Sequence, residues 1–258
     1  ISSFGAIKGK LAEMATKTYV AESLCYRAGQ NIEDKINDLV AGGMDDAKAK
    51  LKGVEQFAIE CAIAKIHGSE VLDYVVDQGV QIYGGMGYSA DAPMERAYRD
   101  ARIARIYEGT NEINRMLMVG MLLKRAMKGE VDIYGPAMEV SKELTSVPTF
   151  STIDKSVLFA GEKEVIKNLK KVFLMVGGKA AMALQDKIED EQEVMMNLAD
   201  ILIEVYACES AMLRTEKLVS QKGEEACTDQ IAMTQIYMAG AVDRVIAAAK
   251  EAIGSFTQ

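Results

Sequence analysis

The stretch "VQIYGGMGYSADAPMERAYRDARIARIYEGTNEINRMLM", residues 80–118, sets the pattern that the rest of the chain follows. It holds two breaks, "YGGMGYSADAP" at 83–93 and "YEGT" at 107–110, and the segments around them have the apolar spacing of helices. Glycine, proline and small polar residues interrupt helices because they favour turns. The stretch therefore predicts three helices joined by two turns.

The segments on both sides of this stretch also have helical periodicity. Apolar residues recur at spacings of three and four in 165–176, 198–213 and 238–246, and no segment alternates with the period of two typical of a strand. The predicted fold class is all-α, a four-helix bundle followed by a second helical bundle. We expect a first helical domain at 1–128, a linker at 129–150 and an additional helical domain at 151–258.

Charge and cysteine content exclude several classes of protein. The net charge of −8 argues against nucleic-acid binding, which needs a basic surface. No apolar run approaches the ~18 residues that span a bilayer. The four cysteines lie far apart, with one histidine to join them, so no metal site is expected. We expect a reduced, intracellular, soluble chain. Because it begins at Ile1 inside a helical pattern, we also expect it to be the C-terminal piece of a longer parent.

Glu108 stands out in the second break, between Tyr107 and Gly109 and just before a helix start. Thr110 or Asn111 can cap that helix, whose first N–H groups attract negative charge and phosphate. A carboxylate on such a turn, beside an aromatic ring, can be partly desolvated, and desolvation makes it a stronger base. Spacing alone favours the plainer interpretation, a solvated loop glutamate near a helix N-terminus.

Two further patterns allow both a structural and a functional interpretation. The glycines of "QIYGGMGY" (81–88) indicate a helix end followed by a glycine turn, or a backbone that lies close against a flat or phosphorylated ligand. The arginines of "ERAYRDARIAR" step by three around a helix, which favours ion pairs with Glu95 and Asp100 over a phosphate patch. His67 has no partner pattern, so we expect it to be structural or partly exposed.

These residues together resemble the C-terminal signature of the acyl-CoA dehydrogenase family. The similarity extends upstream through "KLAEM" and "AIECAIAKIHGSEVLD", and it covers residues 1 to about 125 densely. The remainder is similar, by length and helical character, to the extra C-terminal region of the very-long-chain branch. The resemblance implies α,β-dehydrogenation of a saturated, long-chain acyl-CoA in fatty acid β-oxidation, with FAD as the cofactor.

The resemblance also implies a role for individual residues. Glu108 corresponds to the family's catalytic base, and its backbone N–H would be one donor to the thioester oxygen, an FAD ribityl hydroxyl being the other. Tyr107 and Gly109 would flank the thioester. The implied cofactor neighbours are Gln81, Ile82, Tyr83, Gly84 and Gly85, beside FAD held mainly by a neighbouring subunit, and Thr110, Asn111 and Glu112, beside the pyrophosphate and adenosine of the chain's own FAD.

The implied partners follow from these roles. Shared FAD sites imply a homodimer or a higher homo-oligomer, and the family's electron acceptor is an electron-transfer flavoprotein. The family places a helical domain and a β-domain before this region, so this chain alone is expected neither to bind FAD tightly nor to turn over. The bacterial cytoplasm and the mitochondrial matrix, including the surface of the inner membrane, both suit the chain.

Two alternatives stay open at this point. The chain, or its second helical module, could serve dimerisation or peripheral membrane docking. The best local candidate for docking is "VIKNLKKVFLMVGGKAAMALQDK" (165–187), although an ordinary bundle helix is the favoured explanation of that segment. A related flavoenzyme, such as an acyl-CoA oxidase, would use the same base and differ in whether the reduced flavin reacts with oxygen.

Overall fold

The computed structural model describes residues 1–147, 153–154 and 156–257, and all the regular structure in these residues is helical. The predicted all-α architecture is confirmed. Contacts divide the chain into two compact units, Ile1–Asn114 and Arg115–Gln258.

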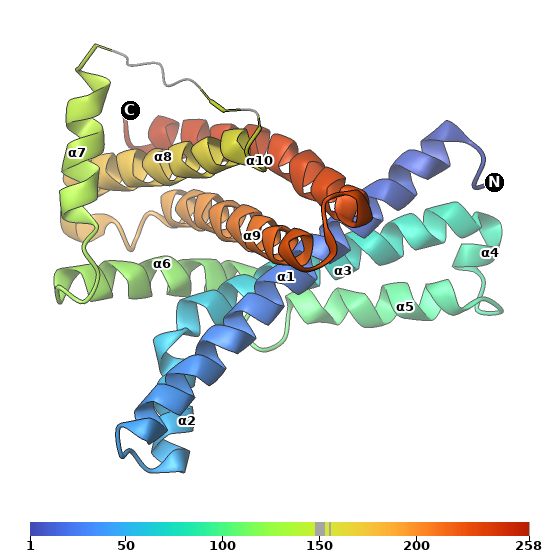
Figure 1. Ribbon diagram of the computed structural model, residues 1–258, viewed down its shortest axis with the longest axis horizontal. Coiled ribbons are helices and arrows are strands. Elements are labelled where there is room, and N and C mark those ends of the chain that lie inside the picture. The colour runs from blue at the N-terminus through green and yellow to red at the C-terminus, as the bar shows by residue number, and fades with distance from the viewer. Residues whose placement is uncertain (148–152, 155, 258) are drawn as a thin grey trace. The chain divides into compact units, whose positions relative to one another are not determined.

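The first unit is organised around α3, which packs against α1 and α5 (Figure 1). Its elements are α1 (Gly5–Ala41), α2 (Asp46–Gln56), α3 (Ala58–Tyr83), the single turn α4 (Gly85–Tyr88), α5 (Pro93–Arg102) and the 3-10 turn η1 (Ile103–Arg105). Val20 and Leu24 of α1 and Ile66 of α3 are completely buried, and they form the centre of this unit. Burial of such side chains stabilises the fold by roughly 1.5–3 kcal/mol each.

Local sequence signals explain where these helices begin and end. The Asp45 carboxylate accepts a hydrogen bond from the Lys48 N–H at 3.2 Å and so caps α2. Pro93 is the first residue of α5, where a missing N–H costs nothing. Gly84 ends α3 with a positive φ of 62°, which a residue with a Cβ rarely adopts.

The second unit is organised around α9, which packs against α8 and α10, while these two also contact each other. Its elements are α6 (Asn111–Met127, which starts in the first unit), α7 (Tyr134–Leu144), α8 (Ala160–Leu184), the 3-10 turns η2 (Gln185–Lys187) and η3 (Glu225–Cys227), α9 (Gln192–Lys222) and α10 (Thr228–Phe256). Val176, Ile201 and Val245 contribute one fully buried side chain from each long helix. The predicted second helical module thus has its own core.

The contacts divide the chain at a different position from the predicted one. The first unit ends at Asn114, whereas the predicted first domain extended to residue 128 and included all of α6. From Arg115 onward α6 belongs to the second unit, because Arg115 Nε donates to Asp200 Oδ1 of α9 at 2.7 Å. The segment expected as a linker, 129–150, contains α7, which packs on α8. Pro136 does not prevent this helix, since it is the third residue of α7 and lies in the first turn, where N–H groups have no partner within the helix.

Tyr74 of α3 contacts Lys17 of α1, and we expect it to make the stability depend on pH. Lys17 Nζ lies 4.9 Å from the centroid of its ring. Burial, a hydrogen bond to Glu13 and the charges of Glu13 and Asp77 raise the pKa of Tyr74 to about 12. In an unfolded chain tyrosine titrates near ~10, so the folded state holds this proton more tightly. We expect the free energy of unfolding to fall as the pH rises from about 10 to about 12.

Urea denaturation across this pH range, compared between the protein and Tyr74→Phe, measures the effect. The variant lacks the titrating group, so its stability should fall less over the same interval. Equal pH dependence in the two proteins would show that Tyr74 does not contribute.

Candidate functional site

The turn between η1 and α6 carries the predicted base. Glu108 has a φ of 55° and Gly109 a φ of 80°, so two consecutive residues adopt the left-handed conformation. Glycine enters this region freely, whereas for glutamate it costs about 1–2 kcal/mol. Residues held in such a conformation by their surroundings cluster at functional sites. Glu108 shares a positive φ with Phe159 and Gln185 among the non-glycine residues that the structure describes, and of these three it is the one that the sequence indicated.

Two side chains hold the carbonyl groups of this turn. Asn114 Nδ2, in the first turn of α6, donates to the backbone oxygens of Glu108 and Gly109 at 3.3 and 2.8 Å. Lys65 Nζ, from α3, donates to the Gly109 oxygen at 2.7 Å and to Asn111 Oδ1, also at 2.7 Å. The turn is therefore tied both to the helix that follows it and to α3.

Asn111 fixes the start of α6 against α3. Its side chain is 1% exposed, and Nδ2 donates to Ser69 Oγ at 2.9 Å and to Glu70 Oε1 at 3.1 Å. Because protein groups occupy both ends of this amide, a contact of Asn111 with a cofactor would have to come from its backbone. The predicted role of Asn111 beside the pyrophosphate stays a prediction in that form.

Thr110 caps α6, which decides between the two caps that the sequence allowed. Thr110 Oγ1 accepts a hydrogen bond from the Ile113 N–H at 3.2 Å, and the Thr110 carbonyl accepts from Asn114 Nδ2 at 3.1 Å. Glu112 lies exposed in the first turn, where a negative charge suits the partial positive charge of a helix N-terminus.

The side chains of Tyr107 and Glu108 lie at the surface of the first unit. Tyr107 is 54% exposed, and Glu108 is also exposed. The described residues therefore do not provide the partial desolvation that the sequence suggested for Glu108. Its carboxylate faces a surface rather than the interior of this unit.

The segment expected beside a flavin is the end of α3. Gly84 donates its N–H to the Gln81 carbonyl at 3.2 Å, so the predicted helix end followed by a glycine turn is confirmed. A Cβ atom at Gly84 or Gly85 would meet no other atom within 4 Å, whereas a Cβ at Gly87 would lie 2.4 Å from the Val80 oxygen. Of the segment, Gln81, Tyr83, Gly84 and Gly85 are exposed and Ile82 is half-buried.

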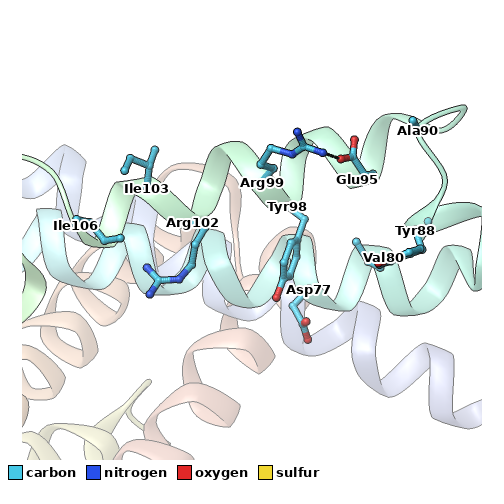
Figure 2. A pocket seen from close by; sticks show the side chains of 11 residues that line it. Asp77, Val80, Tyr88, Ala90, Glu95, Tyr98, Arg99, Arg102, Ile103 and Ile106 are labelled. Atoms are coloured by element: carbon cyan, nitrogen blue, oxygen red, sulfur yellow. Dashed lines mark hydrogen bonds and ion pairs between the residues drawn. The ribbon is translucent and has the colours of Figure 1, made fainter.

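A cavity of about 870 Å³ runs along α5 beside the neighbouring parts of α3 and α4 (Figure 2). Figure 2 shows Tyr88 and Ala90 at one end of its lining and Ile103 and Ile106 at the other. Glu108 does not belong to the lining, although Ile106 nearly adjoins it in sequence. The cavity therefore lies beside the turn rather than within it.

Two arginines at or near this cavity form ion pairs, Arg99 of its lining and Arg105 of the adjacent turn η1. Arg99 pairs with Glu95 one helical turn earlier on α5, as Figure 2 shows, and Arg105 Nη1 lies 2.8 Å from Asp73 Oδ2 of α3. These contacts favour a structural role for Arg99 and Arg105, and Arg105 pairs with Asp73 rather than with the predicted Asp100. His67 is buried, at 7% exposure, which agrees with the structural interpretation.

Lys65, Ser69 and Asn114 are not among the residues predicted from the sequence. Lys65 and Ser69 are one helical turn apart on α3, and polar residues at that spacing beside buried neighbours such as Ile66 were the available signal. Their partners lie more than 40 residues further along the chain, which spacing alone does not reveal. Asn114 lies within residues 80–118, but no sequence pattern distinguishes it from its neighbours.

The segment 165–187, considered for membrane docking, coincides largely with α8. Three of its five lysines pair with acidic side chains: Lys167 lies 3.3 Å from Glu164, Lys171 lies 2.5 Å from Glu143, and Lys170 pairs with Glu209. This pairing favours an ordinary bundle helix.

No helix among the described residues is both long and apolar enough to cross a membrane. In the same part of the chain, no cluster of three or more His, Cys, Asp or Glu could hold a metal ion.

Comparisons with known proteins place the chain in one family. Residues 1–123 and residues 168–258 match two family models, each described as "Acyl-CoA dehydrogenase, C-terminal domain". The chain is 40% identical to a "Probable acyl-CoA dehydrogenase" of Bacillus subtilis over 98% of its own length and 42% of that protein. It is 30% identical to the mitochondrial very long-chain specific acyl-CoA dehydrogenase of Rattus norvegicus, over 86% of its own length and 33% of that protein.

A solved structure agrees with these matches. The crystal structure of an acyl-CoA dehydrogenase complexed with FAD from Bacillus anthracis superposes with a TM-score of 0.92 at 42% identity, over 99% of this chain and 43% of that chain. The chain thus spans less than half the length of each of these proteins.

Proposed function

Because the chain belongs to the acyl-CoA dehydrogenase family, we propose that it is the helical part of an FAD-dependent enzyme that oxidises saturated acyl-CoA to the α,β-unsaturated thioester. One observation carries the assignment of its base. Glu108, the residue that matches the family's base, is exposed on a turn with a left-handed backbone, and Lys65 and Asn114 donate hydrogen bonds to the carbonyl groups of that turn.

The chain's own part in this reaction is proton abstraction. The Glu108 carboxylate takes the α-proton of the thioester, and the electron pair left behind forms the new double bond as the β-hydrogen departs with its own pair. FAD, when bound, supplies the acceptor for that hydride. The thioester oxygen gains negative charge during abstraction, and the backbone N–H of Glu108 would stabilise it. A rigid turn suits both tasks, because base and donor belong to one residue.

The cofactor residues proposed by resemblance fit a flat ring system and its phosphates. Gly84 and Gly85 expose backbone with open space above it, which allows close approach. The N-terminus of α6, with Thr110, Asn111 and Glu112, offers the partial positive charge that attracts a pyrophosphate. Gln81, Ile82 and Tyr83 complete the first surface at the end of α3.

Partners and substrate length belong to the same proposal. Sharing of FAD between subunits would make a homodimer the smallest active unit, and an electron-transfer flavoprotein would reoxidise the flavin. The similarity to a very-long-chain enzyme over 86% of the chain supports a long-chain acyl-CoA as substrate.

The test uses a parent protein, meaning this chain joined to the remaining length found in its relatives. Anaerobic mixing with a long-chain saturated acyl-CoA should bleach the flavin absorbance, and a series of shorter acyl chains should bleach it more slowly. If no acyl-CoA bleaches the flavin, the proposal is wrong, and a dimerisation or docking role takes its place. Oxygen consumption after reduction would instead indicate an acyl-CoA oxidase.

A further inference from the structure

Three hydrogen bonds at the Glu108 turn share one donor. The single nitrogen Asn114 Nδ2 lies within hydrogen-bonding distance of three successive carbonyl oxygens, those of Glu108, Gly109 and Thr110. An amide nitrogen has two hydrogens, so at least one of them is shared between two acceptors. Three consecutive carbonyls can meet one donor only if the backbone curls around it, as the left-handed φ angles of Glu108 and Gly109 require.

Lys65 supplies the second donor from a different element. Its ammonium bonds both the Gly109 oxygen and the buried amide of Asn111, and that amide is in turn bonded to Ser69. Hydrogen bonds from a charged donor are roughly twice as strong as neutral ones. The hydrogen bonds from Lys65 through Asn111 to Ser69 thus tie the turn to α3, and those between Asn111 and Ser69 are buried.

The direction of the Glu108 side chain depends on these contacts. A peptide unit is planar, so fixing the carbonyls of Glu108 and Gly109 fixes the two peptide planes that follow the base. Without the donors, Glu108 would gain about 1–2 kcal/mol by leaving the left-handed region, and its carboxylate would then point elsewhere. The position of the base is therefore imposed by its neighbours rather than preferred by the residue itself.

The charge of Lys65 adds to this arrangement. Desolvation lowers the pKa of the Lys65 ammonium, while the carboxylates of Glu112, Glu70 and Glu108 act in the opposite direction. The ammonium thus lies among three acidic side chains. Removing it would leave their mutual repulsion next to the turn.

We infer that Lys65 and Asn114 are positioning residues, which hold the Glu108 turn in the conformation needed for proton abstraction. The inference rests on the proposed function, because it assigns these two side chains a task only if Glu108 is the base. Neither side chain needs to touch the substrate.

The experiment compares Lys65→Met and Asn114→Asp in the parent protein, loaded with FAD. Asn114→Asp keeps the shape of the side chain and removes its donors, and an acidic residue is tolerated in the first turn of α6. The matched controls are Lys52→Met, an exposed lysine of α2, and Asn197→Asp, whose amide also donates to a carbonyl four residues earlier, at 3.0 Å.

The rate of flavin reduction at saturating acyl-CoA should fall about 10²-fold in both variants, the loss typical of a reacting group misplaced by about 1 Å. FAD content and the dissociation constant of acyl-CoA should stay as in the controls. The double variant should be little slower than either single one, because both donors serve the Gly109 oxygen. Deuterium at the α-carbon should slow the variants more than the unchanged protein, and Lys65→Arg should recover part of the rate.

Two outcomes would overturn the inference: reduction in both variants at the control rate, or weaker acyl-CoA binding with an unchanged maximal rate. If Lys65→Met fails to fold, Asn114→Asp decides alone. The variant Glu108→Gln distinguishes an error in the positioning role from an error in the base assignment. If that variant is slow while Lys65→Met and Asn114→Asp are fast, the positioning role is wrong and the base assignment stands. If Glu108→Gln is as fast as the unchanged protein, the base assignment itself fails.

Discussion

Glu108→Gln should slow the reduction of flavin by acyl-CoA by about 10²–10⁴-fold, the usual loss when a general base is removed. Glutamine has the size of glutamate but does not accept the α-proton under these conditions. The backbone N–H at this position remains, so binding of the thioester and of FAD should change little. Anaerobic rapid mixing of the parent protein with a long-chain acyl-CoA, followed by flavin absorbance, measures the rate.

A second variant at this position tests whether the Glu108 side chain stabilises the fold. Glu108→Gly removes the base as well, but glycine accepts the φ of 55° without the cost that glutamate bears there. Its activity should be lost, while the free energy of unfolding should rise by about 1 kcal/mol or stay unchanged. A variant that is both inactive and strongly destabilised would mean that the Glu108 side chain serves the fold. Rapid flavin reduction in Glu108→Gln would place the base elsewhere.

The sequence was sufficient for the helices and for the two breaks between them because both depend on neighbours along the chain. Apolar periodicity and the glycines at Gly84 and Gly87 act within a few residues, and so does the Thr110 cap. The linker expected at 129–150 did not include α7, a helix that contains Pro136 as its third residue. Three residues into a helix, proline is compatible with the first turn.

The residues that contact the Glu108 turn could not be predicted from the sequence, for a different reason. Lys65 reaches the Gly109 carbonyl across 44 residues, so only the packing of the turn against α3 brings the two together. The left-handed backbone of Glu108 has no local signal either, since glutamate does not favour it. The resemblance predicts that Glu108 is the base, and the structure shows the contacts of Lys65 and Asn114 with its turn.

Gly87→Ala should destabilise the protein by about 3 kcal/mol, the upper part of the range for overpacking. The new Cβ would lie 2.4 Å from the oxygen and 2.9 Å from the Cα of Val80, and 2.8 Å from the Cβ of Tyr83. None of these atoms can turn away by a side-chain rotation, because each belongs to, or is fixed by, the backbone of α3. The short helix α4 would have to move, and with it the exposed end of α3 proposed to contact FAD.

Gly85→Ala is the matched control, two residues earlier in the same short helix. A Cβ at Gly85 meets no other atom within 4 Å, and Gly85 does not have the positive φ of Gly84. Alanine should therefore be neutral or stabilise the protein by about 0.4–1 kcal/mol through the unfolded state. Chemical denaturation of the two variants compares them directly. Equal stabilities would show that α4 does not pack on α3 as described, and the glycines would then be explained by the ligand instead. A loss confined to Gly87→Ala assigns that glycine to packing and leaves Gly84 and Gly85 as the surface open to the flavin.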